Sequence, residues 1–170
     1  MRIEAKHHTI GPRILAGIID LLVVITLVIL KVFLERPGAS RALLIILAVV
    51  GFTAGHFYNV YFHGRFGQTL GKMVAKVKVL TVDEQPISYL QAFVRDSPYV
   101  VLALLALGFE VFSILTRDVA VTAAATRIWN IHSVLMTAFV VTDILVTLAN
   151  PKRRSLHDLI AGTAVVRTDV

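Results

Sequence analysis

The chain has 170 residues, of which 56% are hydrophobic and only 16% are charged; it has no cysteine, and its mean hydropathy is +0.77. A soluble domain is about half apolar and about a quarter charged. The composition therefore excludes a disordered chain, a disulfide scaffold and a cysteine metal cluster, and it indicates a small integral membrane protein. The net charge of +6 comes from Lys and Arg residues that lie mostly outside the apolar segments. Such charges fit lipid headgroups and membrane topology better than nucleic acid.

Four segments are long enough to cross about 30 Å of hydrocarbon, which takes roughly 17–25 residues. They are residues 14–32, 42–62, 99–115 and 128–148. The sequence thus predicts an all-α membrane protein, a four-transmembrane-helix bundle that forms one domain over residues 1–170. A cleaved signal peptide is the alternative for the first segment, but Asp20 and the lack of a clear cleavage site argue against it.

The Lys and Arg residues are unevenly shared between the connecting segments. The N-terminal segment, the loop at 63–98 and the tail at 149–170 together carry 12, and the other two connections carry 5. Because cytoplasmic loops are enriched in Lys and Arg, both termini are expected in the cytoplasm.

The loop at 63–98 has patterns of its own. Apolar residues recur at helical spacing over 68–79, which predicts a short amphipathic helix at the membrane interface. Residues 77–82 then alternate like a strand, as do residues 163–167, and the two runs could pair on the cytoplasmic side. A second amphipathic stretch, 87–94, leads toward the third span.

Several polar residues interrupt the apolar spans, where an ionised side chain needs a partner or a wet cavity. Asp20 lies seven residues after Arg13, nearly on the same helical face and about 10 Å deeper. Asp143 falls at a similar depth in the last span. Two interpretations stay open for Asp20: a structural ion pair with Arg13 or Arg95, or a role in ion binding.

The second span adds His56, Asn59 and His63 on one helical face, and Asp96 precedes the third span. All of these residues fall in the inner half of the membrane. We therefore expect one polar cluster that binds or couples ions and protons, although the histidines could instead serve helix packing. Its members are Asp20, Asp143, Arg13, His56, Asn59 and Asp96. In the outer half, Glu110 is either an outer gate or a water-facing residue near its helix end.

Short motifs add little. Gly51 and Gly55 have the spacing that permits close helix contact, within the chain or in a dimer. The run from Gly67 to Lys72 departs from a P-loop in its glycine spacing, and no catalytic or metal-binding pattern is present. We therefore predict no enzyme, no cofactor and no metal site.

Three blocks of sequence together resemble the RDD family of small bacterial membrane proteins: "RILAGIIDLLVV", "GQTLGKMVAKVKVL" and "RRSLHDLIAGTAVV". The family is named for one arginine and two aspartates. Arg13 and Asp20 resemble the first two of these, and either Asp143 or Asp158 is the third. Other residues in the motif blocks are Gly67, Gln68, Gly71, Lys72, Arg154, Leu156, His157, Asp158 and Gly162.

The resemblance implies transport of a ligand that is not defined for the family, some of whose members have been linked to sodium/proton antiport. We therefore expect a secondary transporter in the bacterial cytoplasmic (inner) membrane that exchanges Na⁺, K⁺ or Li⁺ for protons. Asp20 and Asp143 would bind the ion, with Arg13 tuning their pKa. Four helices leave little protein for two gates, so a homo-oligomer, most simply a dimer, is expected. The alternative is a non-catalytic membrane adaptor with a basic cytoplasmic docking face.

Overall fold

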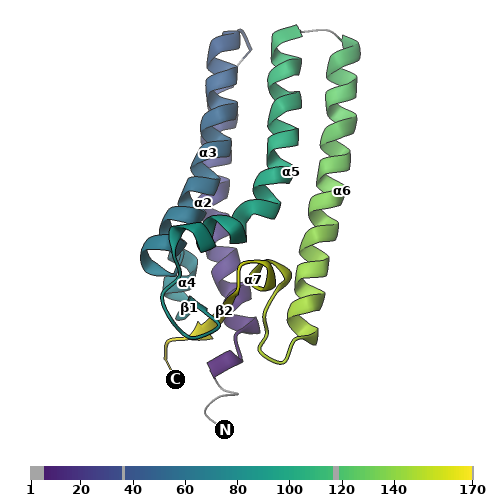
Figure 1. Ribbon diagram of the computed structural model, residues 1–170. Coiled ribbons are helices and arrows are strands. Elements are labelled where there is room, and N and C mark those ends of the chain that lie inside the picture. Colours follow the sequence, from purple (N-terminus) through teal and green to yellow (C-terminus); the bar gives the residue numbers. More distant parts are fainter. Residues whose placement is uncertain (1–5, 36, 117–118, 170) are drawn as a thin grey trace.

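The computed structural model describes residues 6–35, 37–116 and 119–169. Four long helices run along one another (Figure 1). They are α2 (Ile10–Leu34), α3 (Arg41–Phe66), α5 (Tyr89–Thr116) and α6 (Val119–Ala149). Each contains a stretch that is long and apolar enough to cross a membrane, which confirms the predicted four-helix membrane fold. Arg2, Arg36 and Arg117, which were counted for the orientation, lie outside the described residues.

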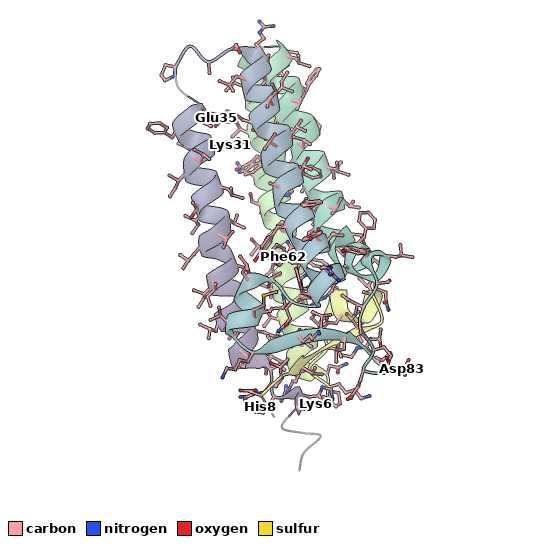
Figure 2. The ribbon with its side chains drawn as sticks, turned by 90° about the vertical axis from the view of Figure 1, so that its left-hand side faces the viewer. Lys6, His8, Lys31, Glu35, Phe62 and Asp83 are labelled. Atoms are coloured by element: carbon pink, nitrogen blue, oxygen red, sulfur yellow. The ribbon has the colours of Figure 1, made fainter. Side chains whose placement is uncertain are left out.

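The remaining elements gather at one end of the bundle (Figure 1). They are α4 (Leu70–Val74), β1 (Val77–Thr81), α7 (Leu156–Ile160) and β2 (Thr163–Arg167). We call this the sheet end and the opposite end the loop end. Figure 2 places Lys6, His8 and Asp83 at the sheet end and Lys31 and Glu35 toward the loop end.

The predicted strand pair is confirmed. Strands β1 and β2 are antiparallel, with Val79 opposite Val165. Two strands alone are marginally stable in water, but this pair has a surface to pack on. Val77, Val79 and Val165 are almost completely buried against Ile87 and Ala92, which lie just before and at the start of α5. The sheet therefore packs against the bundle through the beginning of α5.

Helix α5 differs from the sequence prediction, which separated an amphipathic stretch at 87–94 from a short span at 99–115. The structure has one helix of 28 residues with Pro98 inside it, and the ribbon bends near its beginning (Figure 1). Proline removes one helical hydrogen bond and kinks a helix without having to end it. Arg95 and Asp96 lie just before this proline, and both are buried.

The predicted amphipathic helix over 68–79 is shorter than expected. Helix α4 covers only five residues, because Lys76 has a positive φ of 54° and turns the chain into β1. Thr69 caps α4 with its side chain, which accepts a hydrogen bond from the backbone N–H of Lys72. This turn sets α4 against α2.

The contact between α4 and α2 depends on a glycine. The backbone N–H of Gly71 donates to Asp20 at 2.9 Å. A Cβ atom at position 71 would collide with the backbone carbonyl oxygen of Ala16. Only a residue without a side chain therefore lets the two backbones come this close.

The substitution Gly71→Ala should push α4 away from α2 and lengthen the hydrogen bond to Asp20. We expect it to lower the free energy of unfolding by about 2 kcal/mol, the usual cost of overpacking, measured by thermal unfolding in detergent. Gly108→Ala is the matched control, because a Cβ there meets nothing within 4 Å and alanine favours a helix. Equal unfolding temperatures for the two variants would contradict the close approach.

Candidate functional site

The centre of the sheet end is the carboxylate of Asp158, which is completely buried. Arg13 Nη1 donates to Asp158 Oδ2 at 2.8 Å, and Arg95 Nη2 forms an ion pair with Oδ1 at 2.9 Å. The backbone N–H of Ser155 and the hydroxyl of Thr163 also donate to it. Burial opposes ionisation of this carboxyl, but the guanidinium groups of Arg95 and Arg13 outweigh it and hold the pKa of Asp158 well below its usual range. One carboxylate thus joins α2, α5 and α7.

This arrangement contradicts one of the two interpretations of Asp20, a structural ion pair with Arg13 or Arg95. Both arginines are held by Asp158, and Asp20 accepts hydrogen bonds from uncharged groups only. The donors are the hydroxyl of Tyr58 at 2.8 Å, the hydroxyl of Thr69 at 2.6 Å and the backbone N–H of Gly71. Among the residues that the structure describes, Asp20 has no ion-pair partner.

Asp143, the other embedded aspartate, belongs to a different contact. Its Oδ1 accepts from the backbone N–H of His157 at 3.1 Å and from the ring Nδ1 at 2.8 Å. Burial, and next to it the charge of Arg95, lowers the pKa of the His157 imidazole. A neutral ring that donates from Nδ1 presents a lone pair at Nε2, which accepts from Arg95 Nη2 at 2.8 Å.

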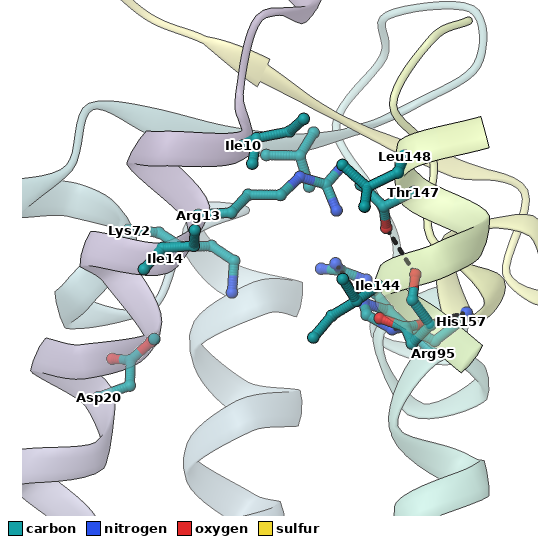
Figure 3. A pocket seen from close by; sticks show the side chains of 13 residues that line it. Ile10, Arg13, Ile14, Asp20, Lys72, Arg95, Ile144, Thr147, Leu148 and His157 are labelled. Carbon is teal, nitrogen blue, oxygen red and sulfur yellow. Dashed lines mark hydrogen bonds and ion pairs between the residues drawn. The ribbon is translucent and has the colours of Figure 1, made fainter. Parts of the chain in front are cut away.

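A first cavity of about 300 Å³ lies between α2 and α6 (Figure 3). Arg13 and Lys72 reach into it from one side, and Arg95 and His157 face them from the other. The charged and titratable residues that line it are Arg13, Asp20, Lys72, Arg95, Asp143 and His157. Two carboxylates that were predicted from separate spans therefore border the same space.

A second cavity of about 440 Å³ is formed chiefly by α3 and α5. In its wall, His56 Nδ1 lies 2.6 Å from Asp96 Oδ2. Its polar lining also includes Asn59, His63 and Tyr99, and it shares Lys72, Arg95 and His157 with the first cavity. The six predicted ion-site residues thus divide equally between two adjoining cavities: Arg13, Asp20 and Asp143 in the first, and His56, Asn59 and Asp96 in the second.

The sequence matched Lys72 to a motif but did not assign it a role. Its side chain lines both cavities and points into the first (Figure 3). No hydrogen bond or ion pair to its ammonium group occurs within the described part of the chain. Burial and the nearby charge of Arg95 lower the pKa of the Lys72 amine to about 7. At neutral pH this amine is therefore present in both protonation states.

The other residues of the motif blocks are mainly structural. They shape the two segments that carry Lys72 and the His157–Asp158 pair. Gly67 ends α3 with a φ of 71°, and Gln68 donates to the carbonyl of Val77. Arg154 donates to the carbonyls of Thr163 and Asp158, Leu156 begins α7, and Gly162 takes a φ of 65° before β2.

The four apolar helices and the buried ionic cluster at one end define a multi-pass membrane protein. The sequence model of the RDD family matches residues 8–162, and the chain belongs to this family. Arg13, which resembles the arginine of the family name, forms an ion pair with Asp158, whereas Asp143 contacts His157. Comparisons with curated proteins and with solved structures gave no match.

The substitution Asp158→Asn should leave two buried guanidinium groups without their counter-ion. Removing one partner of a buried ion pair costs about 3–5 kcal/mol, so we expect a large fall in the unfolding temperature in detergent. Asp169→Asn is the control, since Asp169 is exposed in its pair with Arg167 and its loss should change little. An Asp158→Asn variant as stable as this control would contradict the role of Asp158 in holding the helices together.

Proposed function

We propose that this protein is a secondary transporter that exchanges a monovalent cation, Na⁺, K⁺ or Li⁺, for a proton across a bacterial cytoplasmic membrane. One observation carries the proposal. A lysine with a pKa of about 7 and no ion-pair partner lines the same cavity as Asp20, a carboxylate that also has no ion-pair partner among the described residues.

The exchange of a cation for a proton follows from the balance of charge in the first cavity. With Lys72 protonated, its ammonium provides a positive charge near Asp20, and the carboxylate in turn favours the protonated amine. A cation that enters the first cavity repels this ammonium and lowers its proton affinity. The proton leaves Lys72 Nζ, and the cation takes over its electrostatic role. One cation is then exchanged for one proton.

The first cavity also offers oxygen ligands, which hard cations take. Asp20 contributes its carboxylate from α2, and Asp143 contributes one from α6. Within the described residues, Asp143 Oδ2 accepts no hydrogen bond, because both contacts from His157 fall on Oδ1. That oxygen is free to coordinate a cation.

A series of further cavities supports transport over a purely structural role. The second cavity adjoins a third of about 250 Å³, and the third adjoins a fourth of about 510 Å³ toward the loop end. Each neighbouring pair shares several lining residues. The second and third share Gly51, Phe52, Gly55 and Ala103, and the third and fourth share Lys31, Ala106, Glu110 and Trp129.

An ion pair between α2 and α5 lies in this path near the loop end. Lys31 Nζ contacts Glu110 Oε1 at 2.8 Å and Glu35 Oε1 at 3.5 Å, and Figure 2 shows Lys31 and Glu35 close together. We assign this ion pair as the outer gate. Because the first cavity lies at the sheet end, we assign the arrangement with this outer gate closed as an inward-facing state.

The excess of Lys and Arg at the sheet end supports placing that end in the cytoplasm. Helices α2 and α6 expose large apolar side chains, including Leu21, Leu22, Ile144 and Leu145, which suit contact with lipid. A homo-oligomer, most simply a dimer, stays a prediction, and cross-linking in native membranes is the measurement for it.

Neutralising Asp20 should abolish exchange. Asn at position 20 can keep the bonds from Tyr58 and Gly71 on its oxygen, and the Thr69 hydroxyl can accept from its amide, so we expect folding to be retained. In liposomes with a trapped pH dye, Na⁺, K⁺ or Li⁺ pulses should move protons with the wild type and not with Asp20→Asn. Asp83→Asn, an exposed aspartate after β1, should behave as the wild type. Retained flux in Asp20→Asn would remove this carboxylate from the mechanism, and a flat trace from folded wild type would favour the adaptor alternative.

The pH dependence should follow Lys72. Below about pH 7 the amine is protonated and competes with the cation, so the apparent KM for the cation should rise about tenfold per pH unit of acidification. Above that pH it should level off. Lys72→Met should flatten the dependence, whereas Lys76→Met, at an exposed lysine on the same segment, should keep it. An unchanged slope in Lys72→Met would contradict the role of this amine.

A further inference from the structure

Arg95 uses only part of its hydrogen-bonding capacity. Its side chain is 7% exposed, and its Nη2 serves both Asp158 and His157. Nε and Nη1 are buried and have no acceptor among the described residues. A buried donor without an acceptor is costly, and more so on a charged group. Arg95 lines both cavities, so an acceptor that enters either of them could satisfy these donors.

A second orphaned nitrogen belongs to the second cavity alone. His63 is 7% exposed, and its Nδ1 donates to the backbone carbonyl of Asn59 at 2.8 Å. Its Nε2 is buried and has no partner within the described chain. In the neutral ring this atom holds a lone pair, so it can accept a hydrogen bond from a ligand that carries a hydroxyl group.

The charges around the second cavity favour a negative ligand. Arg95 lines it as a cation, and so does Lys72 when its amine is protonated. The one acidic residue in its lining, Asp96, already contacts His56 at 2.6 Å. Donors without acceptors therefore outnumber free carboxylates on these walls. Guanidinium and ammonium groups are the usual partners of carboxylate and phosphate oxygens.

We propose that the second cavity binds a small oxyanion, a carboxylate or phosphate group, through Arg95 and Lys72. Nε and Nη1 of Arg95 and Nζ of Lys72 donate to its oxygens, and the Lys72 amine takes up a proton as the anion enters. The cavity volume of about 440 Å³ accommodates such a group.

This site goes beyond cation exchange, because it binds an anion in the second cavity, whereas the proposed cation site lies in the first. Lys72 connects the two sites. An anion in the second cavity favours the protonated amine and therefore weakens cation binding in the first, and by linkage the cation weakens anion binding equally. The oxyanion is either free in solution or the phosphate of a lipid headgroup, since the chemistry recognised is the same.

Binding is measured by titration calorimetry on the full chain in a neutral detergent, without alkali cations. The probes are inorganic phosphate, acetate and a water-soluble short-chain phosphatidate. We expect saturable binding whose heat depends on the buffer, because a proton is taken up. Lys72→Met and Arg95→Lys should each weaken it at least tenfold. Arg95→Lys keeps a positive charge near Asp158, and Lys72 forms no ion pair within the described residues.

Arg65→Lys is the matched control, because Arg65 is exposed at the end of α3, and it should bind as the wild type. Binding of phosphate or acetate supports a free oxyanion, and binding of the phosphatidate alone supports a headgroup. No binding of any probe by folded protein, or equal affinities in all variants, would overturn the site. Since no cation flux is measured, that failure would leave the proposed exchange untouched.

Discussion

The buried carboxylate of Asp158 is the constraint on which the sheet end depends. A charge taken out of water is costly unless it is paired and hydrogen-bonded, and Asp158 meets this condition by holding Arg13 and Arg95 together. These contacts fix α2, α5 and α7 relative to one another. They also commit both arginines, which leaves Asp20 without a guanidinium partner. The free charge of Asp20 is therefore a consequence of how Asp158 is neutralised.

Helix α4 brings a different cation to the cavity that Asp20 lines. Gly71 permits the close approach to α2, and the next residue, Lys72, reaches into the cavity. An arginine in that place would stay protonated at every physiological pH. A lysine that is desolvated and repelled by Arg95 releases its proton near neutrality. A permanent ion pair that builds the fold and a titratable amine thus lie beside each other.

The sequence was sufficient for features that are encoded locally. Hydropathy predicts the four helices, and alternation predicts the two strands, because both patterns are read within a few residues. An ion pair of Arg13 with Asp20, one of the two interpretations left open, does not form, because a spacing of seven residues reports only a shared helical face. The true partner, Asp158, lies 145 residues away, and no local pattern indicates it.

Other features that the sequence did not predict also have physical explanations. The stretch at 87–94 and the span at 99–115 were predicted as separate elements, whereas one helix continues through Pro98 with a bend. Lys72 and Arg95 gained importance only from burial and from unused donors, and neither property can be read from a residue type in a loop. Helix α7, which carries His157 and Asp158, has five residues, too few for a helical periodicity to be recognised.

Proton release on cation binding tests the central claim most directly. Purified protein in weakly buffered detergent solution at pH 7 is mixed with NaCl, KCl or LiCl, or with choline chloride as the control, and the released protons are counted with a pH dye. With a Lys72 pKa of about 7, the account predicts about half a proton per bound alkali ion, rising toward one as the pH falls, and none from Lys72→Met. Saturable cation binding without proton release, or the same release from Lys72→Met, would contradict it.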